Sequence, residues 1–242
     1  MALALAAAAG LAGASGMLEL TGWGQAAHAP SGPPTGAAMP SSRFVVVVDA
    51  AHGGDDPGGR LNGQSGQGQA EKDFTLALSV RLRSLLAARG IQVITTREAD
   101  ATVDFDKRAE LADHANAQAC LSLHGSESGF GVHLCVSNMT PVQAARFAPW
   151  KTAQAAWVTR SLALAGTLNS ALLQSGMSVT LGRTALPAVD SMMCPAVAVE
   201  IAPERGPDKK LIADLDDEGY QARVAETLAA ALLEWRTEGR QP

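Results

Sequence analysis

The chain has 242 residues and a mass of 24.9 kDa, the size of one large domain or two small ones. Hydrophobic residues make up 47% and charged residues 18%, which excludes a disordered chain and allows a sizeable buried core. The formal net charge of −5 and the aromatic content of 4% argue against a nucleic-acid partner, because neither a basic footprint nor a stacking platform is available.

The amino-terminal segment has the composition of a targeting sequence. Residues 1–42 contain no Lys or Arg, and Leu3–Ala14 is almost entirely Leu, Ala and Gly. This run is too short to span a bilayer, which takes about 20 apolar residues, but it has the length of a signal-peptide core. Ala27-His28-Ala29 supplies a cleavage-site pattern, although an Ala-rich leader without an export role stays open. The organisation we predict is a signal peptide over 1–29, a Pro/Gly/Ser-rich linker over 30–42 and a catalytic domain over 43–242.

Apolar runs typical of buried strands alternate with segments of helical spacing through the rest of the chain. In chain order, we expect a strand over 44–48, a Gly-rich loop over 50–70, a helix ending before Gly90, a strand over 91–95, a helix over 104–116, strands over 119–123 and 132–136, a helix over 150–174, a strand over 196–199 and a helix from Tyr220 to Trp235. This alternation predicts an α/β fold: a single three-layer domain with a mainly parallel sheet and helices on both faces.

Three of the predicted strands lead into a residue that can bind a metal or move a proton: His52, His124 and Glu200. The carboxyl ends of parallel strands lie along one edge of a sheet, so these residues should converge there. Glu71 joins them, because it begins the first helix directly after the Gly-rich loop. Two His and one Glu form an established zinc set, so we predict that His52, Glu71 and His124 hold one Zn²⁺ and that Glu200 accepts a proton from water. Taken singly, each residue also fits a purely structural role at a strand or helix end.

The ordered motifs resemble those of the zinc-dependent N-acetylmuramoyl-L-alanine amidases (amidase type 3) of the cell-wall hydrolases. The segments that carry the resemblance are Val46–Gly58, Glu71-Lys72-Asp73, Thr95-Thr96-Arg97, Lys107–Ala112, Leu121–His124 and Pro195–Ile201, in an order that holds from about Val45 to Leu233. The resemblance implies one zinc on His52, Glu71 and His124, with Glu200 as the general base. It also implies hydrolysis of the amide between the lactyl group of N-acetylmuramic acid and the L-alanine of peptidoglycan stem peptides. The expected location is therefore outside the cytoplasmic membrane, periplasmic or extracellular, without stable membrane insertion after signal removal.

The sequence departs from the family pattern at positions beside the predicted site. Ala51 replaces the usual Gly, Gly125-Ser126 replaces Ala-Asn, and Ala202–Arg205 replaces Gly-Phe-Leu-Ser-Asn. Two alternatives therefore stay open: a catalytically silent wall-binding or regulatory protein that keeps the fold, and a zinc amidohydrolase of another secreted amide. The stem-peptide preference, any activator protein and the oligomeric state are left open by the sequence.

We interpret Asp49, His133 and the three cysteines as residues with structural roles. We expect Asp49 to hydrogen-bond near the first histidine. His133 is interpreted as a core or surface histidine, and a position facing the site stays open as the alternative. Three cysteines cannot all pair with one another, and no Cys-x-x-Cys pair exists. We therefore interpret Cys120, Cys135 and Cys194 as small buried hydrophobic residues.

Overall fold

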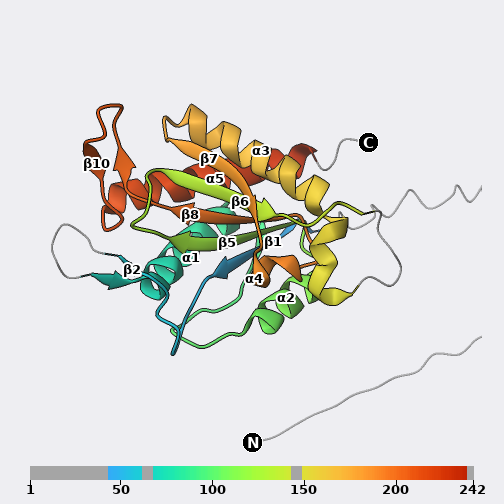
Figure 1. The fold of residues 1–242 in the computed structure, drawn as a ribbon. Coiled ribbons are helices and arrows are strands. Elements are labelled where there is room, and N and C mark those ends of the chain that lie inside the picture. The colour runs from blue at the N-terminus through green and yellow to red at the C-terminus, as the bar shows by residue number, and fades with distance from the viewer. Residues whose placement is uncertain (1–42, 62–67, 143–148, 239–242) are drawn as a thin grey trace, which may run out of the picture. The chain divides into compact units, whose positions relative to one another are not determined.

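A computed structural model describes residues 43–61, 68–142 and 149–238; the predicted signal peptide and linker lie outside these residues. Six strands form the main sheet (Figure 1), from one edge to the other β4 (Gln92–Thr95), β1 (Val45–Ala50), β5 (Ala119–Gly125), β8 (Ala196–Ile201), β6 (Val132–Ser137) and β7 (Val179–Thr184). The first four strands in this order are parallel, whereas β6 is antiparallel to β8 and β7 is parallel to β6. The predicted α/β fold with a mainly parallel sheet is confirmed.

The helices are α1 (Glu71–Ala88), α2 (Phe105–His114), α3 (Val158–Gln174), α4 (Pro187–Asp190) and α5 (Glu218–Glu238). The backbone turns out of α1 at Gly90, whose φ of 71° suits a residue without a side chain. Asp104 caps α2, because its carboxylate accepts a hydrogen bond of 2.7 Å from the backbone N–H of Lys107. The helix predicted over 150–174 is divided into a 3-10 segment, η1 (Trp150–Ala156), and α3.

Besides the short helix α4, three features of the described residues were not predicted from the sequence. One is the edge strand β7, and the others are two short antiparallel hairpins, β2 (Arg60–Leu61) with β3 (Gln69–Ala70) and β9 (Glu204–Arg205) with β10 (Leu211–Ala213). In the described part of the chain, no helix combines the length and the apolar character needed to cross a membrane.

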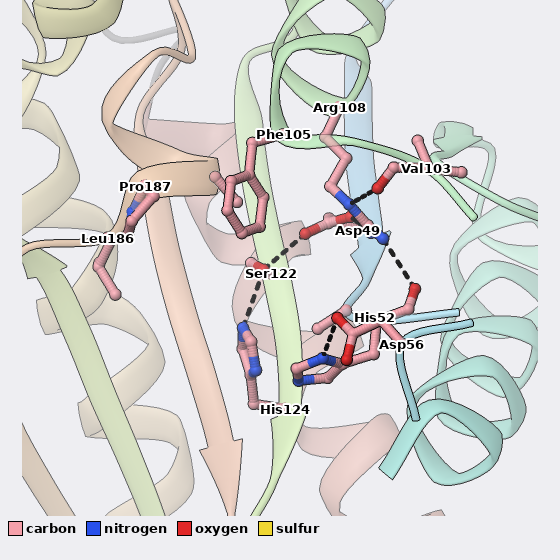
Figure 2. A pocket seen from close by; sticks show the side chains of 12 residues that line it. Asp49, His52, Asp56, Val103, Phe105, Arg108, Ser122, His124, Leu186 and Pro187 are labelled. Carbon is pink, nitrogen blue, oxygen red and sulfur yellow. Dashed lines mark hydrogen bonds and ion pairs between the residues drawn. The ribbon is translucent and has the colours of Figure 1, made fainter. Parts of the chain in front are cut away.

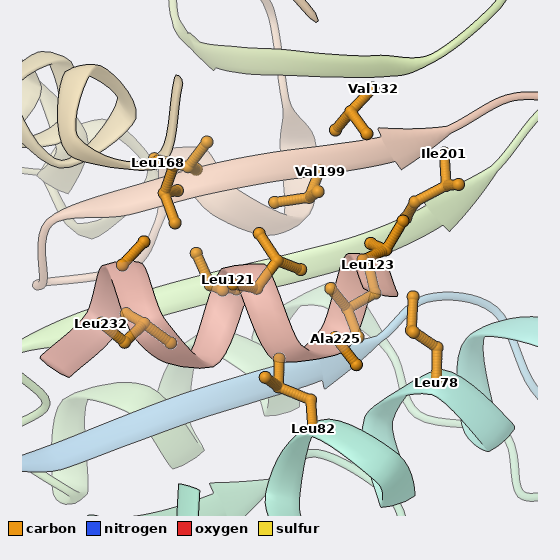
Figure 3. Packing of buried hydrophobic residues seen from close by; sticks show 14 of the residues in the cluster. Leu78, Leu82, Leu121, Leu123, Val132, Leu168, Val199, Ile201, Ala225 and Leu232 are labelled. Atoms are coloured by element: carbon orange, nitrogen blue, oxygen red, sulfur yellow. The ribbon is translucent and has the colours of Figure 1, made fainter. Parts of the chain in front are cut away.

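The larger core lies between one face of the sheet and α1, α3 and α5 (Figure 3). Leu121 and Leu123 of β5 and Val199 and Ile201 of β8 point into this core and are almost completely buried. These residues alternate along their strands, as the two-residue period of a strand requires. The intervening residues of β5 and β8, including His124 and Glu200, therefore belong to the opposite face.

The opposite face carries a smaller core that α2 and α4 cover. Its strand residues include Val47, Cys120 and Ala196, which pack with helix residues such as Ala109 and Val189. Helices thus lie on both faces of the sheet, as predicted. Because this cover packs against the beginnings of β5 and β8, the site-bearing ends of these strands extend beyond the smaller core.

Within the smaller core, a disulfide joins Cys120 at the start of β5 to Cys194 just before β8. The interpretation of this pair as unpaired hydrophobic side chains is wrong. Their sequence separation of 74 residues hid the pairing, which depends on β5 and β8 being neighbours in the sheet. Cys135 on β6 is a free, partly buried thiol.

Candidate functional site

The first predicted ligand, His52, lies in the turn after β1 with a left-handed backbone conformation, φ 63°. Its Nδ1 lies 2.8 Å from Asp56 Oδ2, and its Nε2 lies 3.1 Å from Glu71 Oε2. Nδ1 donates its proton to Asp56, so Nε2 is the ring nitrogen directed toward Glu71. Asp56 was not singled out from the sequence, although its position four residues after His52 in a tight turn was a usable signal.

Glu71 begins α1 and lies between the two histidines, 6% exposed. Its carboxylate accepts hydrogen bonds from the backbone N–H groups of Gly59, at 2.8 Å, and Gly125, at 3.1 Å. Burial acts to raise the pKa of Glu71, but hydrogen bonds from His124 and His52 outweigh it and hold the pKa well below its usual range. The hydrogen bond to Glu71 in turn raises the pKa of His52 to about 9. The position between these side chains therefore favours positive charge.

The second histidine, His124, is fixed by a chain of hydrogen bonds (Figure 2). Its Nδ1 lies 3.1 Å from Glu71 Oε1, and its Nε2 lies 3.3 Å from Ser122 Oγ. Ser122 donates its only hydroxyl proton to Asp49 Oδ2 at 2.6 Å. The Ser122 oxygen must then accept from His124 Nε2–H, so Nδ1 is the ring nitrogen that faces Glu71. Ser122 lies two residues before His124 on the same strand face, a period-two signal that was not used.

The series of hydrogen bonds from His124 through Ser122 ends at Asp49, which is buried. Its Oδ1 accepts hydrogen bonds from Arg108 Nη1 at 2.5 Å and from Thr96 Oγ1 at 2.7 Å. Arg108 also donates to the carbonyl oxygen of His52 at 2.7 Å. Asp49 was expected beside the first histidine, but it contacts the second histidine through Ser122. The first is reached only through Arg108 and the backbone.

His52, Glu71 and His124 offer ligand atoms that all lie within 4.8 Å of one another. Two ring nitrogens and one buried carboxylate are donors that zinc accepts, so this cluster can hold a metal ion. Glu200 is outside the cluster but pairs in register with His124 across β5 and β8. His133 pairs in register with Glu200 and lies 2.5 Å from Thr180, through Nδ1 and Oγ1, so it is a sheet residue outside the cluster.

Two hollows meet at the histidines. The first, here called the Phe105 hollow, is lined by His52, His124, Phe105, Leu186 and Pro187 with neighbouring residues (Figure 2). The second, the Glu200 hollow, is lined by His52, Glu71, His124, Ser126 and Glu200 with neighbouring residues. Both hollows are open to solvent, so a substrate can lie across the cluster with one part in each.

The chain is similar to known amidases in sequence and in fold. The germination-specific N-acetylmuramoyl-L-alanine amidase of Bacillus subtilis (strain 168) is 32% identical over 100 residues, which cover 36% of this chain and 40% of that protein. The match thus spans less than half of that relative. The solved amidase AmiC2 of Nostoc punctiforme has a TM-score of 0.60 and 25% identity, covering 81% of this chain and 99% of that one. The catalytic domain of CwlV from Bacillus (Paenibacillus) polymyxa var. colistinus has a TM-score of 0.61, with 80% and 98% coverage; at 22% identity, this likeness shows the fold alone.

A family model matches most of the chain. The model described as N-acetylmuramoyl-L-alanine amidase matches residues 46–234, a span that includes His52, Glu71, His124 and Glu200. The resemblance inferred from the motifs is therefore confirmed. This chain belongs to the Amidase_3 family of N-acetylmuramoyl-L-alanine amidases.

Proposed function

We propose that this chain is a zinc-dependent amidase of peptidoglycan. It hydrolyses the amide between the lactyl group of N-acetylmuramic acid and the L-alanine of the stem peptide. The observation that carries this proposal is the convergence of His52, Glu71 and His124 within 4.8 Å, beside a fourth residue, Glu200, that lines the same hollow. Family membership supports the reaction, and the ligand geometry supports its assignment to this cluster.

His52 Nε2, the Glu71 carboxylate and His124 Nδ1 are the atoms that would hold the zinc. When bound there, the ion supplies Lewis acidity, which polarises the scissile carbonyl and makes water more acidic. Asp56 holds the His52 ring and Ser122 holds the His124 ring, so that the two ligand nitrogens point toward the same position beside Glu71. Two His and one Glu are a set of protein ligands that would suit a catalytic zinc.

Glu200 has the position of a general base. It is the last residue of β8 on the face opposite the larger core, is only half-buried, and lies in register with His124. Its carboxylate takes a proton from the attacking water as the water oxygen bonds to the carbonyl carbon. As the C–N bond breaks, the same proton passes to the amine of L-alanine, so that the products are a lactyl carboxylate and a free stem peptide.

The substrate places the proposed site of action outside the cytoplasmic membrane, in the periplasm or extracellular space. The signal-like segment over 1–29 supports export. The Cys120–Cys194 disulfide supports it independently, because such bonds persist in oxidising compartments.

The test combines sacculus digestion with metal analysis. Glu200→Gln should keep its zinc and bind sacculi while losing muropeptide release by about 10²–10⁴-fold. His52→Ala should lose most of its zinc under competition with a chelator. Glu226→Gln, which changes an exposed carboxylate on α5, is the matched control and should retain full activity.

Each contrary result has a separate meaning. Zinc loss in Glu200→Gln would make Glu200 a ligand, and unchanged release would remove it from the mechanism. A wild-type protein that holds zinc and binds sacculi without releasing muropeptides would support the silent wall-binding alternative. Hydrolysis of other amides in place of sacculi would favour a different secreted substrate.

A further inference from the structure

The two hollows that meet at His52 and His124 differ in chemistry. The Glu200 hollow is polar, with Glu200, Ser126 and Ser128 in its lining. The Phe105 hollow has an apolar wall that includes Val103, Phe105, Leu186 and Pro187. A substrate whose two sides differ in chemistry would therefore enter this cleft in one orientation.

The wall of the Phe105 hollow presents an aromatic ring to solvent. Phe105 is the first residue of α2 and is 55% exposed. Figure 2 shows its ring projecting over Ser122, with Pro187 and Leu186 across the hollow. An exposed ring in the wall of a hollow, rather than in a core, offers apolar area that a ligand can cover.

The direction of proton transfer indicates which side of the substrate lies in which hollow. This inference rests on the proposed function. The carboxylate that protonates the departing amine must come within about 2.6–3.2 Å of its nitrogen. Glu200 lines only the polar hollow, so the amine and the stem peptide attached to it lie there. The acyl substituent of the scissile carbonyl then leads away from Glu200, toward the Phe105 hollow.

We propose that the Phe105 hollow binds the acyl side of the scissile amide, the lactyl group and its muramyl sugar, and that Phe105 determines specificity for the sugar. The lactyl methyl and the C–H face of a pyranose ring are apolar, so they match the aromatic ring and the Leu186–Pro187 wall. Phe105 acts on binding of the sugar and takes no part in proton transfer.

The experiment compares kcat/KM for two substrates that share one stem peptide. One carries N-acetylmuramic acid on the L-alanine nitrogen, and the other carries a lactyl group alone. Wild-type protein should prefer the muramyl substrate, and Phe105→Ala should reduce kcat/KM for it by about tenfold. The same variant should change kcat/KM for the lactyl substrate by less than about twofold, and Phe105→Tyr should retain the preference.

Phe130→Ala is the matched control, because Phe130 is an exposed aromatic residue, 46% accessible, that lies outside the described linings of both hollows. It should leave the substrate preference unchanged. Zinc content and thermal unfolding of each variant establish that the site and the fold are intact. Equal losses on both substrates, or a wild-type protein without preference, would overturn this inference while the proposed function stands. Failure of the wild-type protein to hydrolyse either substrate would refute the proposed function and the inference with it.

Discussion

Reduction of the Cys120–Cys194 disulfide should lower the free energy of unfolding by about 4 kcal/mol. The bond closes a loop with a sequence separation of 74 residues. In the chain-entropy account, a loop of this length restricts the unfolded ensemble by about 4 kcal/mol at 25 °C. Because reduction removes no heavy atom, it leaves no cavity to add to this figure.

The folded domain should survive reduction, because the same strands are held together in other ways. Cys120 donates a backbone hydrogen bond of 2.8 Å to the carbonyl of Pro195, and β5 pairs with β8 from Cys120 to Gly125. Gln154 adds side-chain hydrogen bonds to the carbonyls of Met192 and Cys194, at 2.8 and 2.7 Å. Reduction is therefore expected to lower the free energy of unfolding mainly by increasing the entropy of the unfolded chain, with little change in the native contacts.

Urea denaturation of oxidised and reduced protein measures the effect. With a urea dependence of about 2 kcal/mol/M, the midpoint should fall by about 2 M on reduction. Cys135→Ala is the control: it removes the free thiol and should show the same gap between its oxidised and reduced forms. Coincident unfolding curves for oxidised and reduced wild-type protein would refute the reasoning. Labelling of all three cysteines in the unfolded, unreduced chain would show that the bond does not form.

Two further predictions concern the metal site and export. Ser122→Ala should weaken zinc binding by about 10–100-fold, because His124 loses the acceptor that fixes its ring, and competition with a chelator measures this loss. Unchanged affinity would show that the hydrogen-bond chain to Asp49 does not orient the histidine. The exported protein should begin between Ala26 and Ser42, as read by amino-terminal sequencing, and an intact leader on a protein that stays in the cytoplasm would contradict the export prediction.

The elements that were predictable are those whose burial leaves a repeating pattern. β1 is buried on both faces, so its apolar run was sufficient to locate it. The convergence of His52, His124 and Glu200 also followed from one rule, that parallel strands present their carboxyl ends at one edge. The ligand roles themselves came from chemistry and resemblance, and they remain predictions until zinc is measured.

What the sequence did not reveal depends on tertiary neighbours. β7 is a largely exposed edge strand containing Gly182 and Arg183, so it lacks the apolar run of a buried strand. The Cys120–Cys194 pairing and the Asp49–Ser122–His124 chain join residues whose proximity depends on which strands lie side by side. Strand order is not visible in a local pattern, although it decides which side chains meet.

The backbone conformation of His52 lowers the stability of the fold, but the same residue is needed to bind the metal. Its φ of 63° costs a residue with a side chain about 1–2 kcal/mol compared with an unstrained position. Hydrogen bonds from Arg108 to its carbonyl and from its ring to Asp56 hold the residue there. Glycine at this position would relieve the strain and remove a metal ligand in the same step. Variants selected only for survival on heating are therefore expected to accumulate substitutions at position 52 that leave a sturdier but inactive protein.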